Sequence, residues 1–192
     1  AYCVHHIYNT HDSLMNIFEA AAEYGTEDNF IEVCSTSKIT YPGSGVAALA
    51  ASDANIAAVK KRMTIQTIGY DKLNEKRHAA FFGDKAGIER HMLRHAEILR
   101  PKFDSVLSAF DKHLAGKGIA AWTKPNGGYF ISLDVYPGCA KRTVQLCKEA
   151  GVTLTGAGAT YPYGKDPEDK NIRIAPTFPS RDELCKAVEI LC

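Results

Sequence analysis

The chain of 192 residues is 45% hydrophobic and 23% charged, which is typical of an ordinary globular protein with one medium or two small domains. Its 23 Lys and Arg nearly balance its 22 Asp and Glu, so it lacks the basic excess that nucleic-acid or acidic-membrane binding requires. A small-molecule partner is the better hypothesis. No apolar run approaches the roughly 20 residues of a membrane span, and no signal segment opens the chain, so we expect a cytoplasmic location. The six cysteines are scattered without a Cys-x-x-Cys pair, and we expect reduced thiols.

The first part of the chain alternates between short apolar runs and amphipathic segments. Residues 1–4 resemble the end of a strand already under way, so we expect the chain to begin inside a larger protein. This alternation is typical of an α/β layer. In order, the pattern predicts a helix from the N-cap Asp12 to Gly25, buried strands at residues 30–34 and 46–51, and a second helix capped by Ser52.

The remaining chain predicts a compact α+β domain. Residues 69–87 are irregular and polar, as expected of a connection. A helix of about seven turns should follow to Gly116, with a kink at Pro101. The later elements are predicted as a hairpin of strands 119–122 and 129–133, a helix at 140–150, strands at 152–155 and 172–175, and a final helix from Ser180.

A lone lysine, Lys38, lies in the turn between the two predicted strands of the first part. Hydroxyl side chains precede it and Pro42-Gly43 follows it, so the turn should direct the amine toward whatever lies at the strand ends. This placement suits a nucleophilic lysine, whose amine attacks an aldehyde only when its surroundings deprotonate it in part. A surface turn lysine without a special role is the alternative.

The run from Ser35 through Lys38 to Pro42-Gly43 resembles the cofactor-lysine motif of fold-type I pyridoxal phosphate (PLP) enzymes, specifically the class I/II aminotransferases. It is most similar to the aspartate aminotransferase branch related to MocR-type proteins. The resemblance covers nearly the whole chain, which matches only the C-terminal half of such a protein. It implies an α/β fold with the end of a large PLP-binding domain at residues 1–69, a connection at 70–87 and a small α+β domain at 88–192.

The resemblance also implies roles for four residues around the cofactor. Lys38 would bond covalently to PLP and move the substrate proton, and Tyr2 would bind the ring hydroxyl oxygen. Ser35 and Ser37 would bind the phosphate, with Ser35 the stronger candidate. Gly45 departs from the family, in which many members have an arginine at this position, and the aspartate expected two residues before Ala1 is absent from the chain. A terminal tyrosine and turn hydroxyls without a special role are the alternatives.

Arg173 lies in an apolar strand, where an arginine is costly unless a carboxylate meets it, and its planar fork suits bidentate carboxylate binding. The resemblance implies that it binds the α-carboxylate of the substrate. Pairing with the local acid Asp169 is the alternative. The implied whole protein is a homodimer that exchanges an amino group between an amino acid, with aspartate favoured, and a 2-oxo acid, with 2-oxoglutarate favoured.

Two other functions stay open. The same fold is the effector-binding domain of MocR-type transcription regulators, and a truncated chain could be catalytically inactive; we expect the isolated 192 residues to be inactive. His91 and His95 lie one helical turn apart but lack a third ligand, so we predict no metal site and place both on the surface of the long helix.

Overall fold

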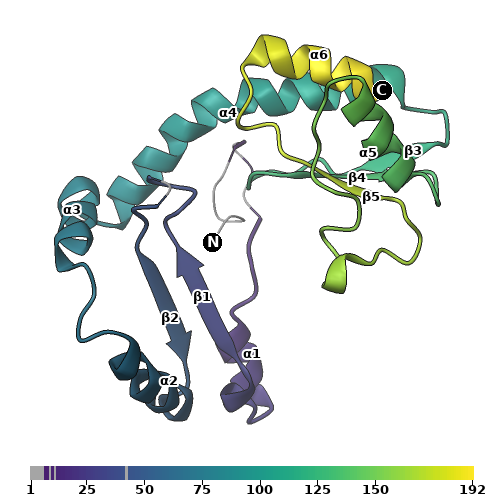
Figure 1. The fold of residues 1–192 in the computed structure, drawn as a ribbon. Coiled ribbons are helices and arrows are strands. Elements are labelled where there is room, and N and C mark those ends of the chain that lie inside the picture. Colours follow the sequence, from purple (N-terminus) through teal and green to yellow (C-terminus); the bar gives the residue numbers. More distant parts are fainter. Residues whose placement is uncertain (1–6, 9, 11, 42) are drawn as a thin grey trace. The chain divides into compact units, whose positions relative to one another are not determined.

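The computed structural model describes residues 7, 8, 10, 12–41 and 43–192. The chain divides into two compact units. Unit 1 comprises the described residues from 12 to 93, and unit 2 comprises residues 94–192 together with Ile7, Tyr8 and Thr10. Helices and small sheets alternate in both units, in agreement with the predicted fold class (Figure 1).

Unit 1 is built on a pair of antiparallel strands, β1 and β2, which lie side by side in Figure 1 with Ile31 opposite Ala51. The strands were predicted within one residue, but their predicted burial is wrong. Four of the five residues of each strand are exposed, because the described residues of unit 1 supply no layers that cover both faces of the pair. The elements are α1 (Ile17–Glu23), the 3₁₀ turn η2 (Glu27–Asn29), β1 (Ile31–Ser35), β2 (Ala47–Ala51), α2 (Asp53–Gln66), α3 (Lys72–Phe82) and the first part of α4 (Lys85–His113).

Two helix starts in unit 1 show how the caps act. The Ser52 hydroxyl accepts a hydrogen bond from the Asn55 amide, so the predicted cap of α2 is confirmed. The predicted cap of α1 at Asp12 is wrong. Asn16 caps this helix instead, with its side-chain oxygen 3.1 Å from the Phe18 amide nitrogen, and the chain before it is not helical.

Helix α3 lies where the sequence indicated an irregular connection. Its start is fixed by Asp71, whose carboxylate accepts from the Asn74 amide at 3.0 Å, and it ends at Gly83, which has a φ of +71°. Only Phe82 in this helix is buried, so the helix carries no broad apolar stripe that the sequence could reveal. The following helix starts close by, since a Cβ on Gly87 would lie 1.7 Å from the Phe82 carbonyl oxygen.

A small cluster forms the buried core of unit 1. Ile39, from the turn after β1, packs with Phe82 of α3 and Met92 of α4, and the partly buried Ile88 joins them. The turn that holds Lys38 is therefore anchored to α3 and α4 by its next residue.

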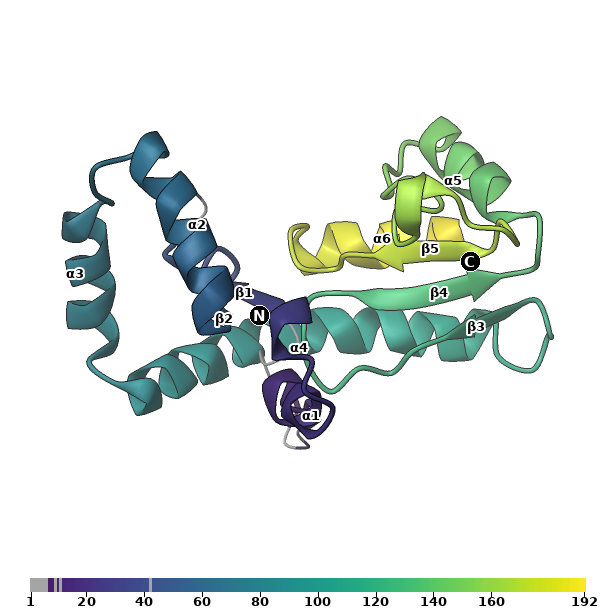
Figure 2. The same cartoon turned by 90° about the horizontal axis from the view of Figure 1, so that it is seen from below.

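Unit 2 contains a three-stranded antiparallel sheet in the order β3-β4-β5. Figure 2 shows β4 and β5 as adjacent arrows, with the later part of α4 along the sheet. The predicted helices at 140–150 and from Ser180 are confirmed, the latter with a capping box between Ser180 and Glu183. The elements after α4 are β3 (Ala120–Trp122), β4 (Ile131–Val135), α5 (Ala140–Glu149), the 3₁₀ turn η3 (Pro162–Gly164), β5 (Asn171–Ile174) and α6 (Arg181–Leu191).

The core of unit 2 lies on one face of this sheet. Ile131 pairs with Ile174 and Leu133 pairs with Ile172, so these four side chains share a face. All four are buried, in one cluster with residues of α4 and α6. The cluster members from the two helices include Leu99, Phe103, Val106, Phe110, Leu184 and Val188.

Two predictions for unit 2 need correction. The hairpin connection is longer than the Pro-Asn-Gly-Gly signal indicated, because β4 begins only at Ile131. Residues 152–155 were predicted as a strand, but they join neither sheet, since β5 already pairs with β4 and no described strand pairs with this segment. They instead line an apolar pocket described below.

Candidate functional site

Lys38 lies in a tight turn that begins where β1 ends. The amides of Ile39 and Thr40 both donate to the Thr36 carbonyl at 2.8 Å, and the Thr36 amide donates to the Val46 carbonyl at 2.9 Å. These bonds close the loop between β1 and β2. Lys38 is exposed, whereas the next residue is buried. The predicted position of the lysine at the strand ends is therefore confirmed.

Two serine hydroxyls lie beside this turn. The Oγ atoms of Ser35 and Ser37 are 2.5 Å apart, and the Ser37 amide donates to Ser35 Oγ at 3.1 Å. The Ser35 oxygen thus accepts the amide proton, and one hydroxyl of the pair donates to the other. Such a pair can offer its remaining hydroxyl proton to an anion.

The absence of an arginine at position 45 agrees with the local packing. A Cβ on Gly45 would lie 2.9 Å from Ser37 Oγ and 3.2 Å from the Ser37 amide nitrogen. Any larger residue here would push against the backbone of the lysine turn. The glycine therefore lets the chain before β2 approach Ser37 closely.

Arg173 lies on β5, on the face opposite the core. It pairs in register with Ser132, whereas its neighbours Ile172 and Ile174 face the core cluster. Its guanidinium carbon lies 4.4 Å from the centre of the Phe130 ring, a cation–π distance. Its Nε is buried and has no hydrogen-bond partner among the residues that the structure describes. The hydrogen-bonding capacity of this buried nitrogen is therefore unmet within the described residues.

The alternative role for Arg173, an ion pair with Asp169, has no support in the geometry. The Asp169 carboxylate accepts from the Lys141 amide at 3.2 Å and lies 3.9 Å from Lys141 Nζ. The structure gives no ion pair for Arg173 within the described part of the chain.

Sequence reasoning missed Asn171, the neighbour of Arg173 on the same face of β5. It is 7% exposed, and its amide nitrogen donates to Ser132 Oγ at 2.8 Å and to Asp134 Oδ1 at 2.7 Å. The Thr160 hydroxyl donates to its amide oxygen at 2.6 Å. A polar residue at period 2 with Arg173 was the available signal. This network holds the polar face of the sheet together.

Sequence reasoning also placed His91 on the surface, which is wrong. It is half-buried, and its Nε2 lies 2.8 Å from the Ile39 carbonyl oxygen, because α4 packs against the lysine turn. His78 of α3, which the sequence analysis did not consider, approaches two threonines of the same turn.

The structure thus brings Lys38, Ser35 and Ser37 together in unit 1 and places Arg173 in unit 2. Tyr2 lies outside the described residues. Their assignment to a single site stays a prediction.

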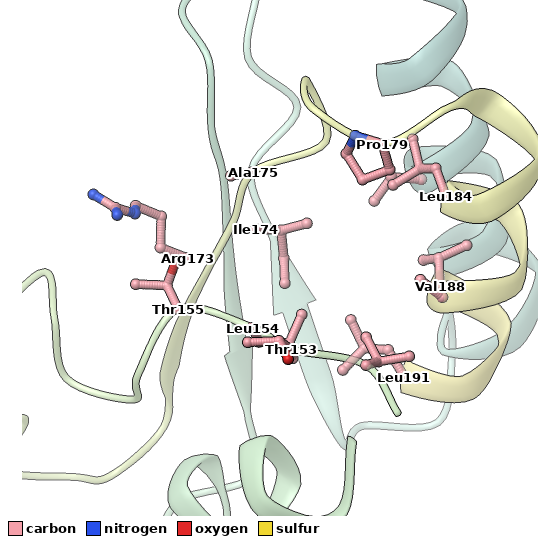
Figure 3. A pocket seen from close by; sticks show the side chains of 13 residues that line it. Thr153, Leu154, Thr155, Arg173, Ile174, Ala175, Pro179, Leu184, Val188 and Leu191 are labelled. Atoms are coloured by element: carbon pink, nitrogen blue, oxygen red, sulfur yellow. The ribbon is translucent and has the colours of Figure 1, made fainter. Parts of the chain in front are cut away.

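Unit 2 also contains a pocket of about 140 Å³ between β5, α6 and residues 152–155. Figure 3 shows that Leu184, Val188 and Leu191 face into it, while the Arg173 guanidinium points away from them. The pocket is thus an apolar cavity on the core side of the sheet and is separate from the arginine fork. Across the described ranges, no three His, Cys, Asp or Glu side chains gather as a metal site, and no helix is long and apolar enough to cross a membrane.

A lysine turn between two strands and an arginine on an antiparallel sheet agree with the class of fold-type I aminotransferases. The sequence model of the family described as "Aspartate amino-transferase" matches residues 1–192, and the chain belongs to this family.

Similar proteins support this assignment. A Mycolicibacterium smegmatis protein, provisionally named an aminotransferase, is 48% identical over 189 residues, which are 98% of this chain and 44% of the relative. The crystal structure of an aspartate transaminase from Corynebacterium glutamicum is 43% identical and matches with a TM-score of 0.93 over 100% of this chain and 45% of its own.

A more distant solved structure shows the fold alone. It is an α-aminoadipate aminotransferase from Thermus thermophilus, complexed with N-(5'-phosphopyridoxyl)-L-leucine, with 20% identity and a TM-score of 0.78 over 100% of this chain and 47% of its own. The chain therefore spans less than half the length of these relatives.

Proposed function

We propose that the whole protein is a PLP-dependent aminotransferase and that the 192 residues carry its covalent lysine and its carboxylate-binding arginine. Family membership and the aminotransferase names of the similar proteins support this function. The observation that carries it is the position of Lys38, exposed in a closed turn with two serine hydroxyls next to it.

The side chains of this turn fit a phosphorylated aldehyde. An amine can bond to the aldehyde carbon, and the hydroxyls of Ser35 and Ser37 can donate to phosphate oxygens. When bound, PLP supplies the electron sink that makes the α-proton of an amino acid removable. Gly45 leaves the serine pair uncovered by a side chain, so the serine hydroxyls and backbone amides would carry more of the phosphate binding here than in relatives with an arginine.

Lys38 has a second role in this proposal. Its Nζ would be the base that removes the proton from the Cα of the amino donor. When the amino group passes to the 2-oxo acid, the same Nζ would return a proton to the α-carbon of the acceptor. A tight turn suits this task, because proton transfer needs the amine held within hydrogen-bond reach of the reacting atom.

Arg173 would orient the substrate by its α-carboxylate. The Phe130 ring packs against the guanidinium, whose end points away from the apolar pocket in Figure 3 and could there meet a carboxylate. The network around Asn171 keeps β5 fixed beneath it.

The finer assignments follow the similar proteins. We propose aspartate as the amino donor, in line with the name of the Corynebacterium glutamicum structure, 2-oxoglutarate as the acceptor, Tyr2 at the cofactor ring, and a homodimer. We expect no transamination by the 192 residues alone, since they span less than half the length of these relatives.

An absorbance titration tests the central part of the proposal. PLP added to the purified chain should produce a visible band of lysine-bound cofactor that disappears in Lys38→Ala and persists in the control Lys72→Ala. A band of equal height in Lys38→Ala would contradict the assignment of Lys38.

A further inference from the structure

Hydrogen bonds among side chains of the Lys38 turn connect it to a histidine of α3, His78. The Val46 amide donates to Thr36 Oγ1 at 2.9 Å, and Thr36 Oγ1 lies 3.0 Å from Thr40 Oγ1. His78 Nε2 lies 3.0 Å from Thr40 Oγ1 and 3.3 Å from Thr36 Oγ1. Its other ring nitrogen, Nδ1, lies 2.9 Å from the Asn74 carbonyl oxygen of its own helix.

The partners determine which nitrogen of neutral His78 carries the proton. A carbonyl oxygen only accepts hydrogen bonds, so Nδ1 must donate to Asn74 and must hold the proton. Nε2 then has a lone pair and accepts from a threonine hydroxyl. Thr36 Oγ1 accepts from the Val46 amide and from the Thr40 hydroxyl, which also lies 3.1 Å from the Thr36 carbonyl oxygen, and His78 Nε2 is the acceptor that both threonine hydroxyls can reach.

His91 contacts the same turn at a different backbone atom, and its neutral ring carries the proton on the other nitrogen. Its Nε2 lies 2.8 Å from the Ile39 carbonyl oxygen, so here Nε2 must donate. The Ile39 side chain is buried at the same place against Phe82 and Met92, and the His91 ring meets Phe82 edge-on at 5.6 Å. Residues before and after Lys38 in the chain are therefore fixed by hydrogen bonds or by packing.

We propose that His78 and His91 are positioning residues of the lysine turn, with His78 protonated at Nδ1 and His91 at Nε2 in the neutral rings. The hydrogen bonds themselves stand on the structure, while their value for cofactor attachment rests on the proposed role of Lys38. Neither histidine touches the reacting atoms; both act by fixing the backbone on which Lys38 is carried.

Nitrogen-15 NMR of the uniformly labelled chain tests the two proton positions without any cofactor. We expect the shift pair of a protonated Nδ1 for His78 and that of a protonated Nε2 for His91, at a pH where both rings are neutral. The reverse pattern at either ring, or fast exchange between both forms, would overturn the inference for that ring.

Matched substitutions test what the bonds do for Lys38. Phenylalanine at position 91 keeps a ring beside Phe82 but cannot donate, whereas glutamine can donate to the Ile39 carbonyl from nearly the same place. We expect His91→Phe to slow the growth of the lysine-bound PLP band about fivefold, the factor equivalent to one hydrogen bond of about 1 kcal/mol. His91→Gln should restore most of the rate, and the distant control His113→Gln should leave it unchanged.

The pair His78→Phe and His78→Gln should behave in the same way, because a glutamine oxygen can accept from the threonine hydroxyl. Equal rates in the Phe and Gln variants of either histidine would contradict a positioning role. Absence of any Lys38-dependent band in the unsubstituted chain would instead contradict attachment of PLP to Lys38 in these 192 residues, and the NMR result would then still decide between the proton positions.

Discussion

The two units keep their strands in opposite environments. In unit 2, Ile131 and Leu133 of β4 are 0% and 1% exposed, whereas in unit 1 Ile31 and Val33 of β1 are 51% and 67% exposed. Unit 2 therefore owes its stability to a core made by its own residues. Unit 1 keeps one turn in place with a small apolar cluster and a few polar bonds. The lysine turn is thus ordered locally, by α3 and α4, and not by burial of the strands that carry it.

The largest expected effect comes from removing a core ring in unit 2. Phe103 is 0% exposed, so Phe103→Ala should lower the free energy of unfolding by about 4 kcal/mol. The matched change in unit 1, Val33→Ala, should stay within about 0.5 kcal/mol, since this side chain is largely exposed. Urea unfolding, followed by a spectroscopic signal from each unit, measures the free energy of unfolding of both variants. Similar losses in the two variants would contradict the difference in burial between the two units.

A smaller effect is expected at the residue that anchors the lysine turn. Ile39 is 7% exposed between Phe82 and Met92, and Ile39→Ala should cost about 2.5 kcal/mol of local stability. Amide hydrogen exchange should show faster opening around α3 and the turn, with the core of unit 2 unchanged. Protection in α3 equal to that of the unsubstituted chain would mean that the cluster does not hold the turn.

The N-cap of α6 should contribute less to stability than the Ile39 side chain does. The Ser180 hydroxyl accepts from the Glu183 amide and donates to its carboxylate, so Ser180→Ala should cost about 1 kcal/mol. The control is Ser13→Ala, at an exposed serine outside any helix. Thermal unfolding of unit 2 distinguishes them, and an equal midpoint in the two variants would contradict the cap.

The last effect appears only in alkali. Burial raises the pKa of Tyr129 to about 12, from an ordinary value of about 10. Because the raised pKa belongs to the folded state, the stability from the neutral phenol is complete below about pH 10 and is lost as the pH rises through about 12. Denaturation midpoints measured across this range should fall less steeply in Tyr129→Phe. Identical slopes would show that Tyr129 does not titrate in this way.

Most of the fold could be predicted because its signals are local. The cap at Ser52, the capping box at Ser180 and the period of α4 each depend on a few neighbouring residues. Helix α3 could not be predicted, because it buries only Phe82 and its polar sequence resembles a connection. The burial of β1 and β2 was also overestimated, since an apolar run shows that a strand can be buried and does not show that a layer covers it.

The candidate site, like the fold, could be predicted only where its signals are local. Lys38, Ser35 and Ser37 were predicted from a contiguous motif, and the structure places them together. His78 and His91 were not predicted as partners of that turn, because their contacts join residues about 40 to 50 positions apart in the chain. Spacing along a helix gives no sign of which distant carbonyl or hydroxyl a ring nitrogen will meet.

The most direct test of the proposed function locates the covalent bond itself. The chain is mixed with PLP, reduced with borohydride to fix the cofactor to whichever lysine holds it, and digested for peptide mass spectrometry. We predict that the peptide carrying Lys38 holds most of the cofactor, well above the exposed lysines Lys72 and Lys165. Even labelling across all three peptides would contradict the assignment of Lys38 as the cofactor lysine.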